Sequence, residues 1–148
     1  MCDEKIQGER EEGGSVRCGE WDLEQIKRVA SIVSGHGFPI SMQGKVKGDV
    51  AVFKAGDISV AGQEISESGN NLWCEEAITY GFCIIPPGST IFPKIGEAMK
   101  KNSRSMTMVN CCVDNNCQAF VPRNINSEYL YYISECIDMN YYDNGAHA

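Results

Sequence analysis

Histidine is scarce in this 148-residue chain and occurs only at His36 and His147. A catalytic triad or a cysteine–histidine hydrolase needs a histidine beside its nucleophile to accept the nucleophile's proton. His147 is the penultimate residue, and His36 lies in a glycine-rich loop without a nucleophile elbow or an oxyanion motif. The sequence therefore predicts no catalytic residue and no enzymatic activity.

The motifs that bind nucleotides and cofactors are also missing. No Gly-Lys-Ser or Gly-Lys-Thr of a phosphate-binding loop occurs, and Gly35-His36-Gly37 lacks the third glycine of a dinucleotide fingerprint. An adenine methylase motif of the Asp/Asn-Pro-Pro-aromatic type is absent, because Pro86-Pro87 follows Ile85 and precedes Gly88. We therefore expect no cofactor, no nucleotide hydrolysis and no methyl transfer by this chain itself.

Long apolar runs are lacking as well. No segment approaches the roughly 20 apolar residues that span a bilayer, and residues 1–5 contain no apolar stretch typical of a secretory signal. We expect a cytoplasmic protein that does not contact a membrane. In that reducing compartment its eight cysteines are expected to be free thiols.

A metal site is not predicted, because no Cys-x-x-Cys pair occurs among the eight cysteines. Three of them lie close together in a strand-like stretch. Because side chains alternate along a strand, Cys111 and Cys117 are expected on one face and Cys112 on the other. The sequence favours their burial as small apolar side chains.

Charge is unevenly distributed along the chain. Acidic residues outnumber basic ones by 20 to 13, and 43% of the residues are hydrophobic, which is enough for one compact domain. Residues 1–20 combine glycines with six acids and three bases, which is typical of a disordered acidic tail. We expect that tail to precede a single domain over residues 21–148.

Hydrophobic periodicity predicts a helix near each end of this domain. The first covers residues 22–32 with Asp22 as its N-cap, and the last covers residues 127–137 with Asn126 or Ser127 as its N-cap. Between them the sequence predicts a helical turn at 75–79 and short strands at 50–54, 58–60, 84–85, 90–92, 106–109 and 117–121. The expected fold is α+β, with a twisted, mixed or antiparallel sheet of short strands.

The most distinctive segment reverses the acidic balance. Residues 92–104 carry four basic side chains and one acid, and they follow a Pro-Gly turn between two strand-like stretches. We expect this turn to present Lys94, Lys100, Lys101 and Arg104 to solvent. Such a surface suits a phosphate backbone, although a solvated charge cluster has the same composition.

Several motifs occur together in a characteristic order. Pro-Gly-Ser-Thr-Ile-Phe-Pro-Lys-Ile-Gly-Glu-Ala occupies residues 87–98, and Cys-Val-Asp-Asn-Asn-Cys-Gln-Ala-Phe-Val-Pro follows at residues 112–122. Upstream lie residues 29–39, then Gln43-Gly44-Lys45, then residues 53–58. In this order the motifs resemble the target recognition domain of type I restriction-modification specificity subunits, over most of the chain.

The resemblance implies sequence-specific recognition of double-stranded DNA without catalysis. The side chains that it places at the DNA are Lys94, Lys100, Lys101, Asn102, Arg104, Gln43, Lys45 and Lys47. Asparagine and glutamine can bond adenine, and arginine and lysine can bond guanine, so the sequence leaves open which of these residues reads bases. The DNA target also stays open.

The resemblance further implies methyltransferase (modification) and restriction subunits as partners, and it leaves a homodimer open. The long helices that follow each recognition domain in that family are missing here, so we expect a domain truncated at its C-terminal end. Because the net charge is −7, a second hypothesis is a protein-interaction module that keeps the fold but has lost DNA binding. The positions of the basic side chains distinguish the two.

Overall fold

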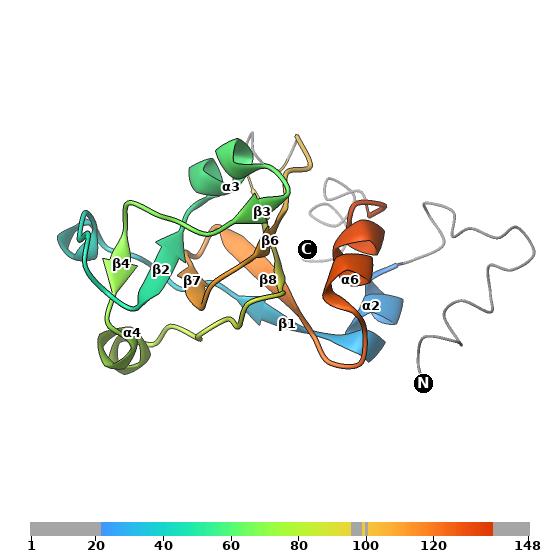
Figure 1. Cartoon of the computed structure of the whole chain (residues 1–148), viewed down its shortest axis with the longest axis horizontal. Coiled ribbons are helices and arrows are strands. Elements are labelled where there is room, and N and C mark those ends of the chain that lie inside the picture. The colour runs from blue at the N-terminus through green and yellow to red at the C-terminus, as the bar shows by residue number, and fades with distance from the viewer. Residues whose placement is uncertain (1–21, 96–98, 100, 138–148) are drawn as a thin grey trace, which may run out of the picture.

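The computed structural model describes residues 22–95, 99 and 101–137. Figure 1 shows its elements in chain order. They are α2 (Leu23–Val29), β1 (Ala30–Ser34), the 3-10 helix η1 (Ile40–Met42), β2 (Val50–Phe53), α3 (Ala55–Ala61), β3 (Glu64–Ile65), β4 (Asn71–Leu72), α4 (Cys74–Tyr80), β5 (Thr90–Pro93), β6 (Ser105–Thr107), β7 (Cys111–Val113), β8 (Cys117–Pro122) and α6 (Ser127–Ser134). The expected tail at residues 1–20 lies outside the described residues.

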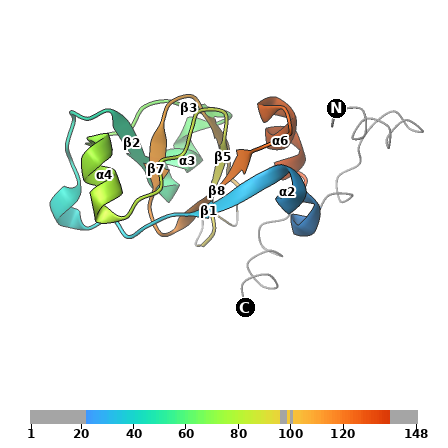
Figure 2. The same cartoon turned by 90° about the horizontal axis from the view of Figure 1, so that it is seen from below.

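The strands form two mixed sheets. The larger has the order β1-β8-β5-β6-β3 and is antiparallel except for the β3–β6 pair, whereas the smaller has the order β4-β2-β7 with a parallel β2–β7 pair. Figures 1 and 2 show α4 at one end of the molecule and α2 with α6 at the other. The fold is therefore α+β with an N-terminal and a C-terminal helix, as the sequence predicts.

The predicted helix over residues 22–32 is wrong in its last three residues. Asp22 and Gln25 form a capping box that starts α2, but the helix ends at Val29 and the chain continues as β1. All five residues of β1 pair with β8, which lies about ninety positions further along the chain. This long-range ladder outweighs the local helical spacing, and the β-branched Ile32 and Val33 suit a strand.

The strand expected at residues 58–60 is also wrong, because these residues belong to α3. The Lys54 amide donates a hydrogen bond to the Asp57 carboxylate at 2.8 Å, which satisfies a free backbone donor at the start of that helix. The helical turn expected at 75–79 is confirmed as α4. The final helix is confirmed with Asn126 as its N-cap, but it ends at Ser134 and not at residue 137. Strands are confirmed as β2, β5, β6 and β8, whereas Ile85 forms only an isolated bridge to Cys111.

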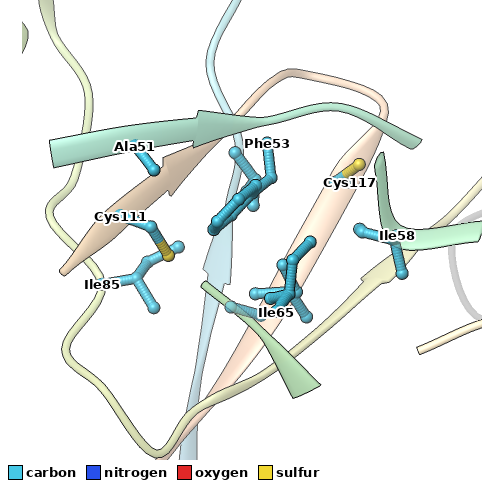
Figure 3. Close-up of a cluster of buried hydrophobic side chains, with 10 residues drawn as sticks. Ala51, Phe53, Ile58, Ile65, Ile85, Cys111 and Cys117 are labelled. Carbon is cyan, nitrogen blue, oxygen red and sulfur yellow. The ribbon is translucent and has the colours of Figure 1, made fainter. Parts of the chain in front are cut away.

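Three clusters of buried side chains hold these elements together. The central cluster lies between the two sheets and includes Phe53, Ile58, Ile65 and Cys117, as Figure 3 shows. A second cluster joins α2 and α6 to the larger sheet, and a third packs α4 onto the smaller one. The core therefore joins the two sheets to each other and holds the helices at both ends of the molecule.

The cysteine pattern predicted from strand alternation is confirmed. Cys111 and Cys117 lie in the central cluster, and Cys112 lies in the third cluster with Val52 and Leu72. Cys74, Cys83 and these three residues carry free thiols. Cys136 is disulfide-bonded, so the expectation of free thiols throughout is wrong at that position.

Alkaline pH is expected to unfold the domain through its buried thiols. Burial raises the pKa of Cys112 from its ordinary value of 9.0 to about 12, and it raises the pKa of Cys111 and Cys117 as well. The raised pKa favours the native state below about pH 9, and this contribution disappears as pH rises toward the folded pKa. Urea titrations between neutral pH and about pH 11 should show the free energy of unfolding falling above about pH 9, and less steeply for Cys112→Ala. If the free energy of unfolding falls equally steeply with pH in Cys112→Ala, the buried Cys112 thiol is not a cause of the fall.

Candidate nucleic-acid interface

The loop at residues 35–47 is anchored at its start to the turn between β7 and β8. The Gly35 amide donates to the Cys117 carbonyl at 3.1 Å, and the His36 amide donates to the Val113 carbonyl at 3.1 Å. The Gly35 Cα also approaches the backbone of Asp114 so closely that no side chain fits between them. The predicted recognition loop therefore begins at a fixed point.

Two lysines from other elements meet at the same turn. The Lys94 amide, just after β5, donates to the Asn116 carbonyl at 2.9 Å. The Asp114 amide donates to the Phe53 carbonyl at 3.2 Å, which places the turn beside Lys54 at the end of β2. The structure thus brings Lys54, Lys94 and the start of the loop together around residues 114–116.

Gln43 is held inside this arrangement rather than left free. Its Nε2 donates to the Phe38 carbonyl at 2.9 Å, and its Oε1 accepts a hydrogen bond from Lys54 Nζ at 2.9 Å. A base could bond this amide only by displacing one of these partners. The sequence did not single out Lys54 as a residue that positions Gln43, because the two are eleven positions apart in a segment without regular spacing.

Lys45 and Lys47 differ in their surroundings. Lys45 Nζ lies 2.7 Å from a carboxylate oxygen of Glu76, and its hydrogen bond lowers the pKa of that carboxyl. Both side chains reach solvent, so water screens this ion pair and a phosphate can replace the carboxylate. Lys47 is exposed. The loop therefore offers one exposed lysine and one that is paired reversibly.

The basic segment at residues 92–104 is only partly on the surface. Lys101 is exposed, Lys94 is half-buried, and Lys100 lies outside the described residues. Asn102 adopts a left-handed conformation with φ of 58°, which asparagine tolerates better than most residues. The chain turns sharply there before β6 begins.

The expectation that Arg104 faces solvent is wrong. Only 4% of this residue is exposed, and its guanidinium donates hydrogen bonds to the Asn102 carbonyl at 3.4 Å and the Ile137 carbonyl at 3.3 Å. The Tyr131 hydroxyl also donates to the Arg104 carbonyl at 3.4 Å. The turn at Asn102 places Arg104 next to β6, where its side chain ties that strand to the segment following α6.

The described residues are close to neutral. They include eleven carboxylates and nine basic side chains, which leaves a net charge of −2, whereas the whole chain carries −7. Most of the negative charge therefore belongs to residues outside the described part. No three histidine, cysteine, aspartate or glutamate side chains within residues 22–95, 99 and 101–137 are arranged to hold a metal ion. None of the helices in this part is long and apolar enough to cross a membrane.

Two hollows in the surface were not predicted. An open groove of about 750 Å³ separates the loop at residues 35–47 from α4, and a smaller pocket of about 300 Å³ lies between β3, β6 and α6. The smaller pocket is lined by Glu64, Glu128 and Glu135, which would repel a phosphate. The groove could have been suspected from Trp73 and Tyr80, because residues seven positions apart share one face of a helix.

Comparison with known proteins identifies the fold but not a family. No protein-family model and no curated protein matches this sequence. Among solved structures, the HsdS subunit from Thermoanaerobacter tengcongensis matches over 86% of this chain and 30% of its own, with 17% identity and a TM-score of 0.53. A chain from a structure of the type I R-M system, solved to explain its complex assembly and conformational transition, matches over 90% of this chain and 33% of its own, with 16% identity and a TM-score of 0.54.

The chain thus spans about a third of the length of each of these proteins. At this low identity the likeness concerns the arrangement of helices and strands rather than any activity. The described domain has the fold of part of an HsdS subunit, a component of type I restriction-modification systems.

Proposed function

We propose that this domain recognises double-stranded DNA as a specificity module of the type I restriction-modification kind, without catalysis of its own. The observation that carries the proposal is the fold shared with HsdS over 86% of the chain. The order of the sequence motifs quoted above supports it independently. In this proposal the partners are DNA and, in a larger assembly, methyltransferase and restriction subunits, or a second copy of the chain, in the cytoplasm.

The proposed contact surface combines the turn at residues 114–116 with lysines of the loop at residues 35–47 and of the basic segment at residues 92–104. Lys47 and Lys101 are exposed and Lys94 is half-buried beside the turn, so these three can approach phosphates without rearrangement. Gln43 and Lys45 can join them once DNA displaces Lys54 and Glu76. Arg104 is left out of this surface because it is buried. Phosphate contacts of this kind position the protein, whereas base contacts select the sequence.

Removing the three accessible lysines is expected to weaken the salt dependence of DNA binding. Each neutralised phosphate contributes about 0.9 to the slope of log affinity against log salt, so Lys47→Ala, Lys94→Ala and Lys101→Ala together should flatten it by roughly two to three units. Fluorescence anisotropy of a labelled random duplex over a salt series measures this slope. Arg28→Ala is the matched control, because Arg28 is exposed on α2, beyond the opposite end of β1. Equal slopes for the triple variant and the unaltered protein would contradict the proposed surface.

The alternative is a protein-interaction module with the same fold. The excess of carboxylates over bases supports it, since DNA-binding surfaces usually carry a basic excess. If the unaltered protein shows no salt-sensitive binding to duplex DNA at low ionic strength, alone or with a methyltransferase subunit, this alternative replaces the DNA proposal.

A further inference from the structure

Exposed hydrophobic side chains gather at one end of the molecule. Nine large hydrophobic side chains are exposed in the described residues. Five of them belong to residues 40–46 or to α4 and the residue before it, namely Ile40, Val46, Trp73, Ile78 and Tyr80. Figures 1 and 2 show α4 at this end of the molecule. Exposed apolar surface concentrated in this way is typical of an interaction site.

The open groove lies within this surface. It is lined by Met42 and Lys45 on one side and by Trp73, Glu75, Glu76, Thr79 and Tyr80 on the other. Its volume of about 750 Å³ is enough for several side chains of a bound segment. We call it the α4 groove.

The Trp73 backbone and the Tyr80 ring, which form the aromatic walls of the α4 groove, are held by contacts within the protein. The Trp73 amide donates to the Glu76 carboxylate at 3.2 Å, which fixes the backbone at the start of α4. The Tyr80 ring packs edge-to-face on His36 at 5.0 Å and lies 5.9 Å from Phe82. Since these contacts order the Tyr80 ring before any partner arrives, binding against it costs little side-chain entropy. Tryptophan and tyrosine are also the residues that most often dominate binding energy at interfaces.

The charge around the α4 groove is negative. Residues 57–76, which lead into α4, contain five carboxylates and no basic side chain, and α4 itself contains no base. Lys45 neutralises Glu76, but Glu75 is exposed at the groove. A carboxylate beside two aromatic faces attracts a cation, because the ring faces are themselves electronegative. The same charge disfavours the phosphates of a nucleic acid.

We propose that the α4 groove binds a segment of a partner protein in which an arginine or lysine is flanked by apolar residues. The basic side chain lies between Trp73 and Tyr80 and pairs with Glu75, while the apolar neighbours cover Met42 and the exposed side chains around it. This site does not depend on DNA binding by Lys47, Lys94 and Lys101. The two surfaces share Lys45 and Glu76, and the groove assigns a function to Trp73, Glu75 and Tyr80, which the DNA proposal leaves uncovered.

The fluorescence of Trp73, which lines the groove, can report binding of a peptide there. The chain has only two tryptophans, so Trp21→Phe leaves Trp73 as the single fluorophore of this type. A synthetic peptide of alternating leucine and arginine should quench or shift the Trp73 emission saturably, whereas the peptide with glutamate in place of arginine should not. In a separate titration with a dye-labelled peptide, Trp73→Ala should weaken binding by about tenfold or more, as expected for a central aromatic contact.

A charge-matched pair separates specific binding from general attraction to an acidic protein. Glu75→Gln and Glu67→Gln each remove one exposed carboxylate, but only Glu75 lines the groove. We expect Glu75→Gln to raise the dissociation constant of the arginine peptide about threefold to tenfold and Glu67→Gln to leave it unchanged, since the lost ion pair is partly exposed. Equal effects of the two variants, or equal binding of the arginine and glutamate peptides, would overturn the proposal. Tighter binding of oligothymidylate in competition with the peptide would instead make the groove a nucleic-acid site.

Discussion

Gly35→Ala is expected to cost about 3 kcal/mol or more of folding free energy, because the new methyl group has no space. A Cβ at this position would lie 1.7 Å from the Asp114 carbonyl oxygen and 2.5 Å from its carbonyl carbon. These are backbone atoms of the β7–β8 turn, so no side-chain rotation relieves the overlap. The backbone at position 35 would have to move away from the β7–β8 turn, and the hydrogen bonds of Gly35 to Cys117 and of His36 to Val113 would break.

The natural control lies two residues further along the same loop. A Cβ at Gly37 would meet no atom within 4 Å, so Gly37→Ala should change stability by about 0.5 kcal/mol or less. Urea denaturation of both variants, followed by circular dichroism, measures the two free energies. Similar midpoints for both would show that the loop is not docked on the turn as described. A strong loss in Gly35→Ala alone would establish this contact as a determinant of the fold.

Features set by neighbouring residues could be predicted from the sequence. The Asn126 cap of α6 follows from a side chain that accepts the Tyr129 amide three residues later, at 2.9 Å. The opposite orientations of Cys111 and Cys112 follow from alternation along one strand. In both cases the interacting groups are separated by at most three positions, so local pattern is sufficient.

Features set by residues far apart in the chain could not be predicted from the sequence. β1 forms because Ala30–Ser34 pairs with a strand about ninety residues later, and the local helical spacing gives no sign of that partner. The candidate interface depends on similar contacts, since Lys45 meets Glu76 across 31 positions. The sequence shows that residues 92–104 are rich in basic side chains. Composition alone does not reveal on which side of a turn each of these side chains lies.

Arg104 shows most clearly that composition does not reveal burial. Its replacement is expected to have the second large effect on folding stability. Arg104→Ala removes a buried side chain and leaves the Ile137 carbonyl without its donor. The lost packing and the unpaired carbonyl together should lower the free energy of unfolding by about 2–4 kcal/mol. Urea denaturation measures this loss. Lys101→Ala is the matched control, since it removes the same charge from an exposed position three residues earlier, and it should change stability by about 0.5 kcal/mol or less.

DNA binding by the same two variants should show the reverse order. If Lys101 contacts a phosphate, Lys101→Ala lowers the slope of log affinity against log salt by about 0.9, whereas folded Arg104→Ala leaves the slope unchanged because a buried guanidinium neutralises no phosphate. Binding is measured at a temperature where both variants are folded by circular dichroism. A stable Arg104→Ala variant with a flattened slope would contradict the buried position and return Arg104 to the DNA-binding surface. A flattened slope for Lys101→Ala together with an unchanged slope for Arg104→Ala would separate the two roles within one basic segment, with Lys101 at the DNA and Arg104 in the interior.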